Sequence, residues 1–335
     1  MPRREADKTI PAERYVVSNQ KNVPAIIFGT MTFGKQVDEK TADRMVALFL
    51  EKGHVQLDTA HTYADGLSEE ILGRILTPSR RRKVYLATKV NPGKGGGLAP
   101  EQLTKQLELS LRRLNADSVD LLYLHAPDPR TPIEETLDCC DRLFRQSKFR
   151  ELGLSNYASW QVIDIWRLCE QRGWMRPAVY QGMYNAITRD VERELFPALR
   201  RAGMRFCAYN PLAGGFLTGK YSLPETKPSA GRFVLLANYM DRYWRGSSFK
   251  ALEIVRRACG EKGLTVTEGA LRWLIVHSLL NGAGGDGIII GASGLEQFEE
   301  NLKSCGEKEL PGDLIAAFDQ AWEIVRPECP RYFRP

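Results

Sequence analysis

The sequence predicts a (β/α)8 barrel, because short apolar, β-branched runs alternate with helical patterns along the whole chain. The first seven runs recur at a spacing of roughly thirty residues, the length of one strand-plus-helix unit. No glycine-rich fingerprint follows the first run, which disfavours a doubly wound dinucleotide-binding sheet. The eight runs are residues 25–28, 55–58, 84–89, 119–125, 151–154, 178–181, 205–209 and 288–290.

Helix periodicity fills the segments between the runs. Apolar residues there recur at every third or fourth position, so one face of each helix is expected to pack on the strands. Thr131 and Pro132 open one helix, and Gly53 and Gly173 follow the ends of two others. The clearest apolar stripes are Ala42, Met45, Val46 and Phe49; Leu103, Leu107, Leu111 and Leu114; and Ile133, Leu137, Cys140 and Phe144.

A long insertion separates the seventh and eighth runs. It leaves the carboxyl end of the seventh strand, so it is expected on the face of the barrel where such folds place their sites. We expect a loop over residues 210–246 and helices over 249–262 and 267–279, with a further helix over 310–325. The barrel domain is expected to span 24–335, after a polar N-terminal extension over 1–23.

Composition excludes several classes of protein. With 26% charged and 43% hydrophobic residues, the chain resembles an ordinary folded enzyme and not a disordered, fibrous or coiled-coil protein. The net charge of +6 is too diffuse to indicate nucleic-acid binding. We expect the one dense basic run, Arg80 to Lys83, to be a solvated loop.

Cysteine usage and hydropathy together indicate a cytoplasmic protein. The seven cysteines form no CxxC pair, which is typical of small core residues in a reducing compartment. No apolar stretch is long enough to span a membrane, and the first twenty residues lack the apolar centre of a secretory signal.

Two glycine-rich segments resemble nucleotide-binding loops. Residues 282–287 fit GxGxxG, but they precede a strand, whereas a dinucleotide fingerprint follows a strand and opens a helix. Residues 93–97 are expected to form a flexible loop. Neither segment is interpreted as a cofactor site.

Polar residues at consecutive strand ends form the candidate catalytic site. Asp58 ends the second strand, Lys89 the third and His125 the fourth, and Tyr63 lies in the loop after Asp58. Because the carboxyl ends of barrel strands surround one small volume, we expect these four side chains to meet. We expect no metal there.

This set suits the reduction of a carbonyl group. When hydride adds to the carbonyl carbon, the oxygen must receive a proton, and Tyr63 can supply it. A phenol is a weak acid, and the charge of Lys89 would lower its pKa. Asp58 would offset the cost of burying the ammonium group, and His125 could hydrogen-bond the carbonyl oxygen.

Each residue also has a simpler interpretation, as a helix cap, a packing residue or a surface residue. Asp58, His61 and His125 could alternatively be metal ligands, although a further fixed histidine or glutamate is not evident. A cysteine nucleophile lacks a thiol at a strand end near His125. The joint placement on adjacent strand ends favours the proton-delivery site over these alternatives.

Several motifs make the chain resemble the aldo-keto reductases, and within them the aflatoxin-aldehyde (succinic semialdehyde) reductase branch. The stretches around the candidate site match the catalytic tetrad of that family. The resemblance runs from about residue 24 to the end of the chain. The segments that carry it are 53–63 (GHVQLDTAHTY), 87–89, 124–125, 151–157 (ELGLSNY), 179–188 (VYQGMYNAIT), 210–220 (NPLAGGFLTGK) and 328–334 (ECPRYFR).

The resemblance implies roles for individual residues. Tyr63 would be the general acid, Lys89 would lower its pKa, Asp58 would pair with Lys89 and touch the nicotinamide, and His125 would contact the substrate. NADPH would lie along the barrel mouth, where Tyr209 could stack on the nicotinamide or simply pack at the rim. The other residues expected to bind the cofactor are Ser155, Asn156, Gln181, Asn210, Leu212, Gly214, Lys220, Arg232, Ser293, Gln297 and Asn301.

The substrate side is expected at Tyr239, Arg242 and Arg334. The two guanidinium groups could bind an anionic tail on an aldehyde, or they could be surface or dimer contacts. The expected partners are thus a small carbonyl compound and, if the protein is a homodimer, a second copy of the chain. Gly294 departs from the branch pattern, in which a hydroxyl residue is usual, and the segment 220–239 is shorter.

From the residues alone, residues 291–294 after the last strand should place free backbone N–H groups at a helix N-terminus, where a phosphate can bind. One alternative function remains open. The same fold serves as a cofactor-binding β subunit of potassium channels, and an intact site does not by itself prove turnover.

Overall fold

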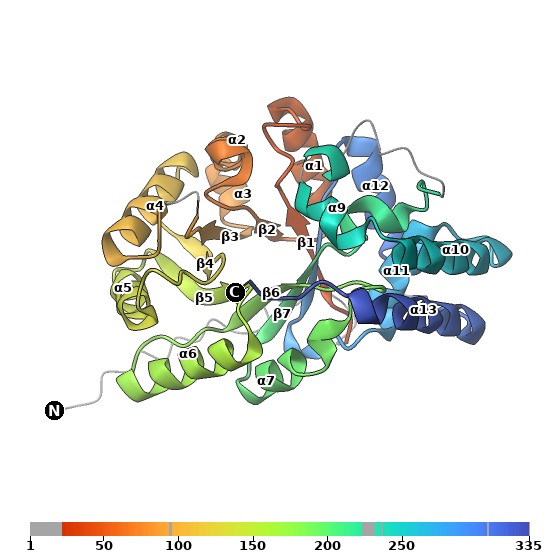
Figure 1. The fold of residues 1–335 in the computed structure, drawn as a ribbon. Coiled ribbons are helices and arrows are strands. Elements are labelled where there is room, and N and C mark those ends of the chain that lie inside the picture. The colour runs from red at the N-terminus through yellow and green to blue at the C-terminus, as the bar shows by residue number, and fades with distance from the viewer. Residues whose placement is uncertain (1–21, 94–95, 223–231, 236, 307, 335) are drawn as a thin grey trace.

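The computed structural model confirms the predicted barrel (Figure 1). It describes residues 22–334 except 94–95, 223–231, 236 and 307. All strands are parallel, each pairs with the next, and β8 pairs with β1 to close the barrel. The strands are β1 (Ala25–Gly29), β2 (Gln56–Asp58), β3 (Tyr85–Val90), β4 (Val119–Leu124), β5 (Phe149–Ser155), β6 (Val179–Met183), β7 (Arg205–Tyr209) and β8 (Gly287–Ile290).

Helices surround the barrel as an outer ring in Figure 1. Two of the predicted apolar stripes, those that contain Met45 and Leu107, are confirmed, since all their residues are buried. The third is confirmed at Leu137 and Cys140 but not at Phe144, which is 38% exposed while Leu143 is buried in its place. The described helices are α1 (Glu39–Glu51), α2 (Leu67–Ile75), α3 (Pro78–Arg81), α4 (Pro100–Arg113), α5 (Ile133–Arg145), α6 (Ser159–Arg172), α7 (Leu195–Arg201), α8 (Arg232–Leu235), α9 (Ala237–Tyr243), α10 (Gly246–Glu261), α11 (Val266–Arg272), α12 (Leu295–Ser304) and α13 (Gly312–Val325).

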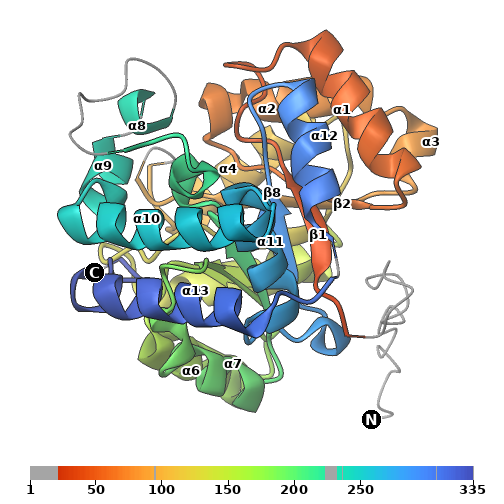
Figure 2. The ribbon, with the colours of Figure 1, turned by 90° about the vertical axis from the view of Figure 1, so that its right-hand side faces the viewer.

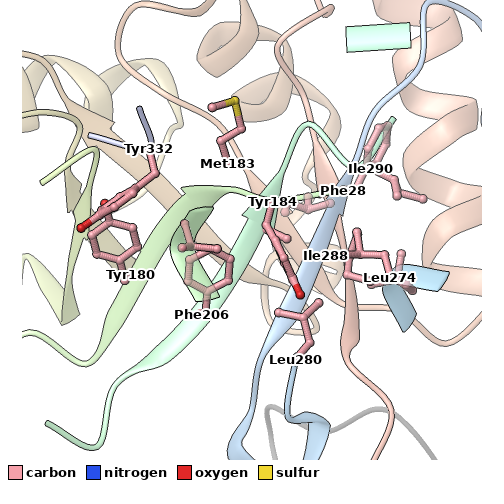
Figure 3. Packing of buried hydrophobic residues seen from close by; sticks show 14 of the residues in the cluster. Phe28, Tyr180, Met183, Tyr184, Phe206, Leu274, Leu280, Ile288, Ile290 and Tyr332 are labelled. Carbon is pink, nitrogen blue, oxygen red and sulfur yellow. The ribbon is translucent and has the colours of Figure 1, made fainter. Parts of the chain in front are cut away.

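Strand alternation sorts the side chains into two cores. On β1, Phe28 packs toward the helices while Ile27 points into the barrel, as the two-residue period of a strand requires. The larger core lies between strands and helices, and Figure 3 shows part of it around Tyr180, Phe206 and Ile288. The smaller core fills the barrel interior with Ile27, Ala87, Leu121, Tyr123, Val179, Cys207 and Ile289.

A polar network closes the barrel interior at the amino ends of the strands. The Arg205 guanidinium donates to both carboxylate oxygens of Glu151, at 3.0 and 2.9 Å, and the Tyr85 hydroxyl donates to the same carboxylate. These side chains come from the first half of their strands. The inward positions at the opposite, carboxyl ends therefore remain for the site.

The insertion after β7 leaves the carboxyl end of that strand, as predicted. Residues 210–246 are not simply a loop, because they include a short 3-10 segment, η4 (Ala213–Thr218), and helices α8 and α9; α10 and α11 follow. The helix expected over 267–279 is interrupted, because α11 ends at Arg272 and Trp273–His277 forms a wider π-helical turn. Figure 2 shows α10 beside α13, and the two helices are in contact.

Some predictions need correction or fall outside the described residues. The basic run is a solvated loop only in its second half, where Arg82 and Lys83 form an exposed turn. Arg80 and Arg81 instead end α3 and pair with Asp43 and Asp120. The GxGxxG segment does precede β8, as expected. Of the expected N-terminal extension only residues 22 and 23 are described, and residues 94–95 of the expected glycine loop are not. None of the described helices is long and apolar enough to cross a membrane.

A substitution at Gly153 tests the packing of the barrel interior. A Cβ at this position of β5 would lie 2.3 Å from the Tyr123 ring, which is fully buried on the neighbouring strand β4. Gly153→Ala should therefore lower the free energy of unfolding by about 1–3 kcal/mol, measured by urea denaturation.

The matched control is Gly260→Ala, since Gly260 is an exposed residue of α10 and a Cβ there meets no atom within 4 Å. It should leave stability unchanged or raise it by up to about 1 kcal/mol. Equal effects of the two substitutions would contradict the packing assigned to Tyr123.

Candidate functional site

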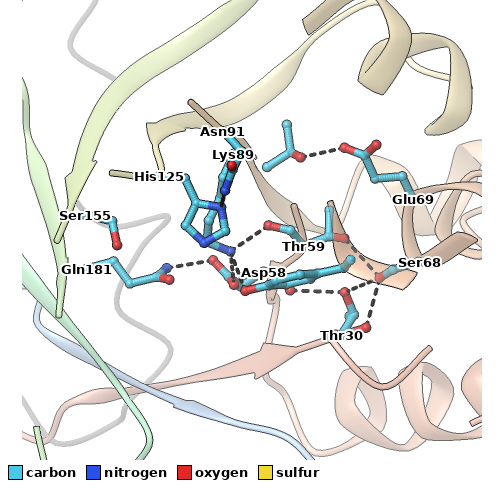
Figure 4. A network of polar contacts seen from close by, with 12 residues as sticks. Thr30, Asp58, Thr59, Ser68, Glu69, Lys89, Asn91, His125, Ser155 and Gln181 are labelled. Atoms are coloured by element: carbon cyan, nitrogen blue, oxygen red, sulfur yellow. Dashed lines mark hydrogen bonds and ion pairs between the residues drawn. The ribbon is translucent and has the colours of Figure 1, made fainter. Parts of the chain in front are cut away.

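A polar layer of side chains lies at the carboxyl end of the barrel interior (Figure 4). On β3 the inward positions run Tyr85, Ala87 and Lys89, so the side chain following the apolar interior is an ammonium group. The same alternation brings the other strand-end residues to this level. They are Asp58, His125, Ser155, Gln181 and Tyr209.

Lys89 and Asp58 form a buried ion pair in this layer. Lys89 is 0% exposed and Asp58 2% exposed. The Lys89 Nζ donates to Asp58 Oδ1 at 2.5 Å, to the Thr59 carbonyl at 2.6 Å and to the Tyr63 hydroxyl at 3.1 Å. An ammonium group has three donors, so all of them are used. The second Asp58 oxygen accepts from Gln181 Nε2 at 2.8 Å, which completes the carboxylate's environment.

Charge at this pair is set by burial and mutual attraction. Burial lowers the pKa of Lys89, but Asp58 and Tyr63 outweigh it, and the pKa of Lys89 is raised above its usual value. For Tyr63, burial raises the pKa and the charge of Lys89 lowers it. Burial dominates, so the net lowering expected from the sequence is not found. At neutral pH the site holds an ammonium group beside a protonated phenol.

The loop carrying Tyr63 is held from below by hydroxyl groups. The Ser68 hydroxyl contacts those of Thr30 and Thr59 at 2.9 and 3.0 Å and donates to the Thr30 carbonyl (Figure 4). Directly after Tyr63, Ala64 and Asp65 adopt left-handed backbone conformations, with φ of 50° and 56°. This sharp turn sets the ring of Tyr63 edge-on to His125, with centroids 6.2 Å apart.

His125 is kept neutral by its surroundings. Burial, followed by the charges of Lys89 and Arg334, holds the pKa of His125 well below its usual range. One ring nitrogen, Nδ1, lies 3.2 Å from the Asn91 side-chain nitrogen. Asn91 is not among the site residues predicted from the sequence. Asn91 directly follows β3, as His125 directly follows β4. This shared position after neighbouring strands could have predicted that the two side chains meet.

A cavity of about 340 Å³ opens above this layer. Lys89 lies behind Tyr63 and does not line it, and the side chain of Arg232 lies outside what the structure describes. Every other residue predicted for the site lines this cavity: Asp58, Tyr63, His125, Ser155, Asn156, Gln181, Tyr209, Asn210, Leu212, Gly214, Lys220, Tyr239, Arg242, Ser293, Gln297, Asn301 and Arg334.

Sequence reasoning missed the contribution of the loop after β1. Met31, Thr32 and Gln36 line the cavity beside the predicted residues. Thr32 donates to the Ala292 carbonyl at 2.8 Å, which ties this loop to the segment after β8. Topology alone could have predicted this contribution, because the loop after the first strand lies on the same face of the barrel as the loops after the other strands.

The donors along the cavity fit an elongated polar cofactor. Asn210 is buried, and its Nδ2 has no partner among the described residues, while its Oδ1 accepts from the Tyr239 hydroxyl at 2.9 Å. Gly214 leaves room for the Tyr239 ring, because a Cβ there would lie 2.4 Å from it. A ligand that reaches Asn210 could therefore satisfy its buried amide group.

At the start of α12, the backbone N–H groups are not all free, as they were expected to be. The Ser293 backbone N–H and hydroxyl both donate to Gln297 Oε1, each at 2.8 Å. One of the N–H groups predicted to be free at the start of α12 is therefore occupied by a side chain. Gly294 precedes α12 without a side-chain cap, and Asn301 Nδ2 donates to the Gly291 carbonyl at 3.2 Å.

Two arginines approach the cavity from the insertion and the C-terminal tail. Arg242 lies 5.5 Å from the centre of the Tyr239 ring. The Arg334 backbone N–H donates to the Asn156 carbonyl at 2.9 Å and so anchors the tail across the barrel mouth (Figure 1). Burial raises the pKa of Tyr209 to about 12, although Arg242 and Arg334 both act to lower it. Both guanidinium charges thus reach the same part of the cavity.

Comparison with known proteins identifies the family. A family model described as the aldo/keto reductase family matches residues 25–323. The chain belongs to this family. It is 50% identical to human aflatoxin B1 aldehyde reductase member 2, with 92% of this chain and 89% of that protein covered. It is 47% identical to human aflatoxin B1 aldehyde reductase member 4 (92% and 97% covered) and 48% identical to human aldo-keto reductase family 7 member A3 (93% and 97% covered).

This aldo/keto reductase is therefore an NAD(P)H-dependent oxidoreductase, and carbonyl reduction is the reaction that its family and relatives support. The predicted resemblance to the aflatoxin-aldehyde reductase branch is confirmed. These three relatives are named as reductases, and none of them supports the channel-subunit alternative.

The sequence left two other kinds of site open, a metal site at Asp58, His61 and His125 and a cysteine nucleophile. Within the described part of the chain, no group of three His, Cys, Asp or Glu side chains is placed to hold a metal ion. His61 instead contacts the Ser110 hydroxyl at 3.3 Å through Nδ1. Cys207 lies inside the barrel, and burial raises the pKa of its thiol to about 12, so it is not a thiolate at neutral pH.

Proposed function

We propose that this aldo/keto reductase reduces aldehydes or ketones to alcohols with NADPH and that Tyr63 delivers the proton. One observation carries the proposal. The Tyr63 oxygen accepts a hydrogen bond from the Lys89 ammonium group at 3.1 Å, while Tyr63 itself lines the cavity. Because the oxygen already accepts on the Lys89 side, its own proton is available to a carbonyl oxygen in the cavity.

Tyr63, Lys89, Asp58 and His125 each have a separate role in proton delivery. A nicotinamide cofactor held by the cavity residues would supply the hydride for the carbonyl carbon. As negative charge develops on the carbonyl oxygen, Tyr63 donates its proton and becomes a phenolate. The fixed positive charge of Lys89 stabilises that phenolate, and Asp58 keeps Lys89 charged in its buried position. His125 donates a hydrogen bond to the same carbonyl oxygen.

The cavity lining supports a binding mode for NADPH. Ser155, Asn156 and Gln181 lie beside Asp58 and would hold the carboxamide, with Tyr209 available to stack on the nicotinamide. Residues 210–220 would cover the pyrophosphate. Lys220 lines the cavity and would bind the 2′-phosphate, together with Arg232, while Ser293, Gln297 and Asn301 would hold the adenosine end.

The preferred substrates are proposed to be aldehydes that carry a carboxylate. Tyr239, Arg242 and Arg334 line the cavity that also contains Tyr63 and His125. Two guanidinium groups in a partly enclosed cavity favour an anion through charge-assisted hydrogen bonds. This location supports a substrate role over a purely surface role for both arginines.

Two properties of the whole protein remain proposals. The seven cysteines, all in the described part of the chain, are free thiols, which supports a reducing compartment such as the cytoplasm. The homodimer and the boundary of the N-terminal extension stay predictions.

Tyr63→Phe tests the proposed reaction. Removing the hydroxyl should reduce the rate of aldehyde reduction by about 100-fold or more, because general acid catalysis typically contributes that much. NADPH binding, followed by cofactor fluorescence, should be retained. The control is Tyr221→Phe, a tyrosine outside the cavity lining, which should keep its activity. Normal turnover in Tyr63→Phe would contradict the proposal.

Arg242→Gln and Arg334→Gln test the substrate class. Each should raise KM for a four-carbon semialdehyde acid by about tenfold, roughly the contribution of one charge-assisted hydrogen bond, and leave KM for butanal nearly unchanged. Arg257→Gln, on exposed α10 and paired with Glu261, serves as the control for loss of a charge. Equal effects on both aldehydes would argue against an anion-binding role.

A further inference from the structure

The contact between Asn91 and His125 joins the ends of two neighbouring strands. Asn91 directly follows β3 and His125 directly follows β4, and the His125 backbone N–H donates to the Val90 carbonyl at 3.0 Å. This backbone bond places the two side chains next to each other. Asn91 Nδ2 lies 3.2 Å from His125 Nδ1 (Figure 4).

The orientation of the Asn91 amide is fixed by its other contacts. Its Oδ1 accepts the Gly93 backbone N–H at 2.9 Å, so the oxygen side of the amide is committed to the loop. Its backbone N–H donates to Gln106 Oε1 at 2.8 Å, and Gln106 Nε2 donates to the Gly97 carbonyl at 2.8 Å. Gln106 is itself buried on α4, so the loop after β3 is held against a helix. With the oxygen engaged, the NH₂ group is the part that faces the histidine ring.

This orientation decides which nitrogen of His125 carries the proton. A neutral imidazole has one N–H donor and one acceptor nitrogen. Because Asn91 offers an N–H to Nδ1, Nδ1 must be the acceptor, and the proton resides on Nε2. His125 lines the cavity, whereas Asn91 is not among its lining residues. The N–H of Nε2 is therefore the group left for a ligand in the cavity.

We propose that Asn91 is a positioning residue that holds His125 in the Nε2–H tautomer, so that His125 donates a hydrogen bond to the carbonyl oxygen of the substrate. The tautomer follows from the contacts of Asn91 alone. Its consequence for catalysis rests on the proposed function. Burial and the charges of Lys89 and Arg334 keep His125 neutral, and a neutral ring presents the correct group only in one tautomer.

The substitution Asn91→Asp tests this role with little change of shape. One carboxylate oxygen can still accept the Gly93 N–H, but the other now faces Nδ1 as an acceptor and favours a proton there. We expect kcat for aldehyde reduction to fall by about 100-fold, the typical effect of losing one donor to the developing oxyanion, with NADPH binding retained. Asn115→Asp, which adds the same charge at an exposed position after α4, should keep kcat within about twofold of wild type.

Nitrogen-15 NMR reads the tautomer independently of activity. The chain has only four histidines, so the His125 signals can be assigned by comparison with His125→Gln in protein labelled on its imidazole nitrogens. Wild type should show an unprotonated Nδ1 and a protonated Nε2 for His125. Asn91→Asp should show a protonated Nδ1 and an unprotonated Nε2, and Asn115→Asp should match wild type.

Three results would overturn the proposal. The first is a wild-type His125 with its proton on Nδ1, and the second is an Asn91→Asp protein whose His125 signals are unchanged. The third is a changed tautomer in Asn91→Asp with undiminished kcat, because the tautomer would then not matter to catalysis. Failure of the proposed function would look different, since wild-type protein would not reduce aldehydes while the NMR signals of His125 could still be as expected.

Discussion

Lys89 and Asp58 carry opposite charges inside the barrel, and most of the site depends on their pairing. Desolvation of either group alone would cost several kcal/mol, which their attraction and a full set of hydrogen bonds offset. The ammonium group reaches Tyr63 only because Asp58 and the Thr59 carbonyl hold it at the end of β3. Gln181 holds the second oxygen of Asp58, and the hydroxyl groups beneath Tyr63 hold the loop that carries this tyrosine.

The barrel supplies the geometry that this pairing requires. Residues on a strand alternate between the interior and the helices, so an apolar interior ends in a polar layer when the last inward residue of each strand is polar. Above the network of Arg205 and Glu151, the interior of this protein is apolar at Ala87 and Tyr123. It becomes polar at Lys89 and His125. Stability and chemistry therefore use successive inward positions of the same strands, and the loops add Tyr63 and most of the residues that line the cavity above them.

The sequence was sufficient for the fold and for most of the cavity lining. Strand runs and helical stripes repeat with clear periods, and the strand ends of a barrel meet by topology, so Asp58, Lys89 and His125 could be grouped without coordinates. Side-chain orientation could not be predicted in the same way. That Asn91 faces His125, that Gln297 occupies the N–H of Ser293, and that burial outweighs Lys89 in setting the pKa of Tyr63 all depend on distances within loops. Arg80 and Arg81 were misassigned because their carboxylate partners lie far away in the sequence.

A double-mutant cycle on the unfolding free energy measures the central interaction most directly. Lys89→Met and Asp58→Asn should each destabilise the protein by about 3–5 kcal/mol, because each disrupts a buried, fully paired group. The double variant leaves no lone charge, so its loss should be smaller than the sum of the two single losses by about 2–3 kcal/mol. Losses that add to within about 0.5 kcal/mol would contradict the view that this buried pair organises the site.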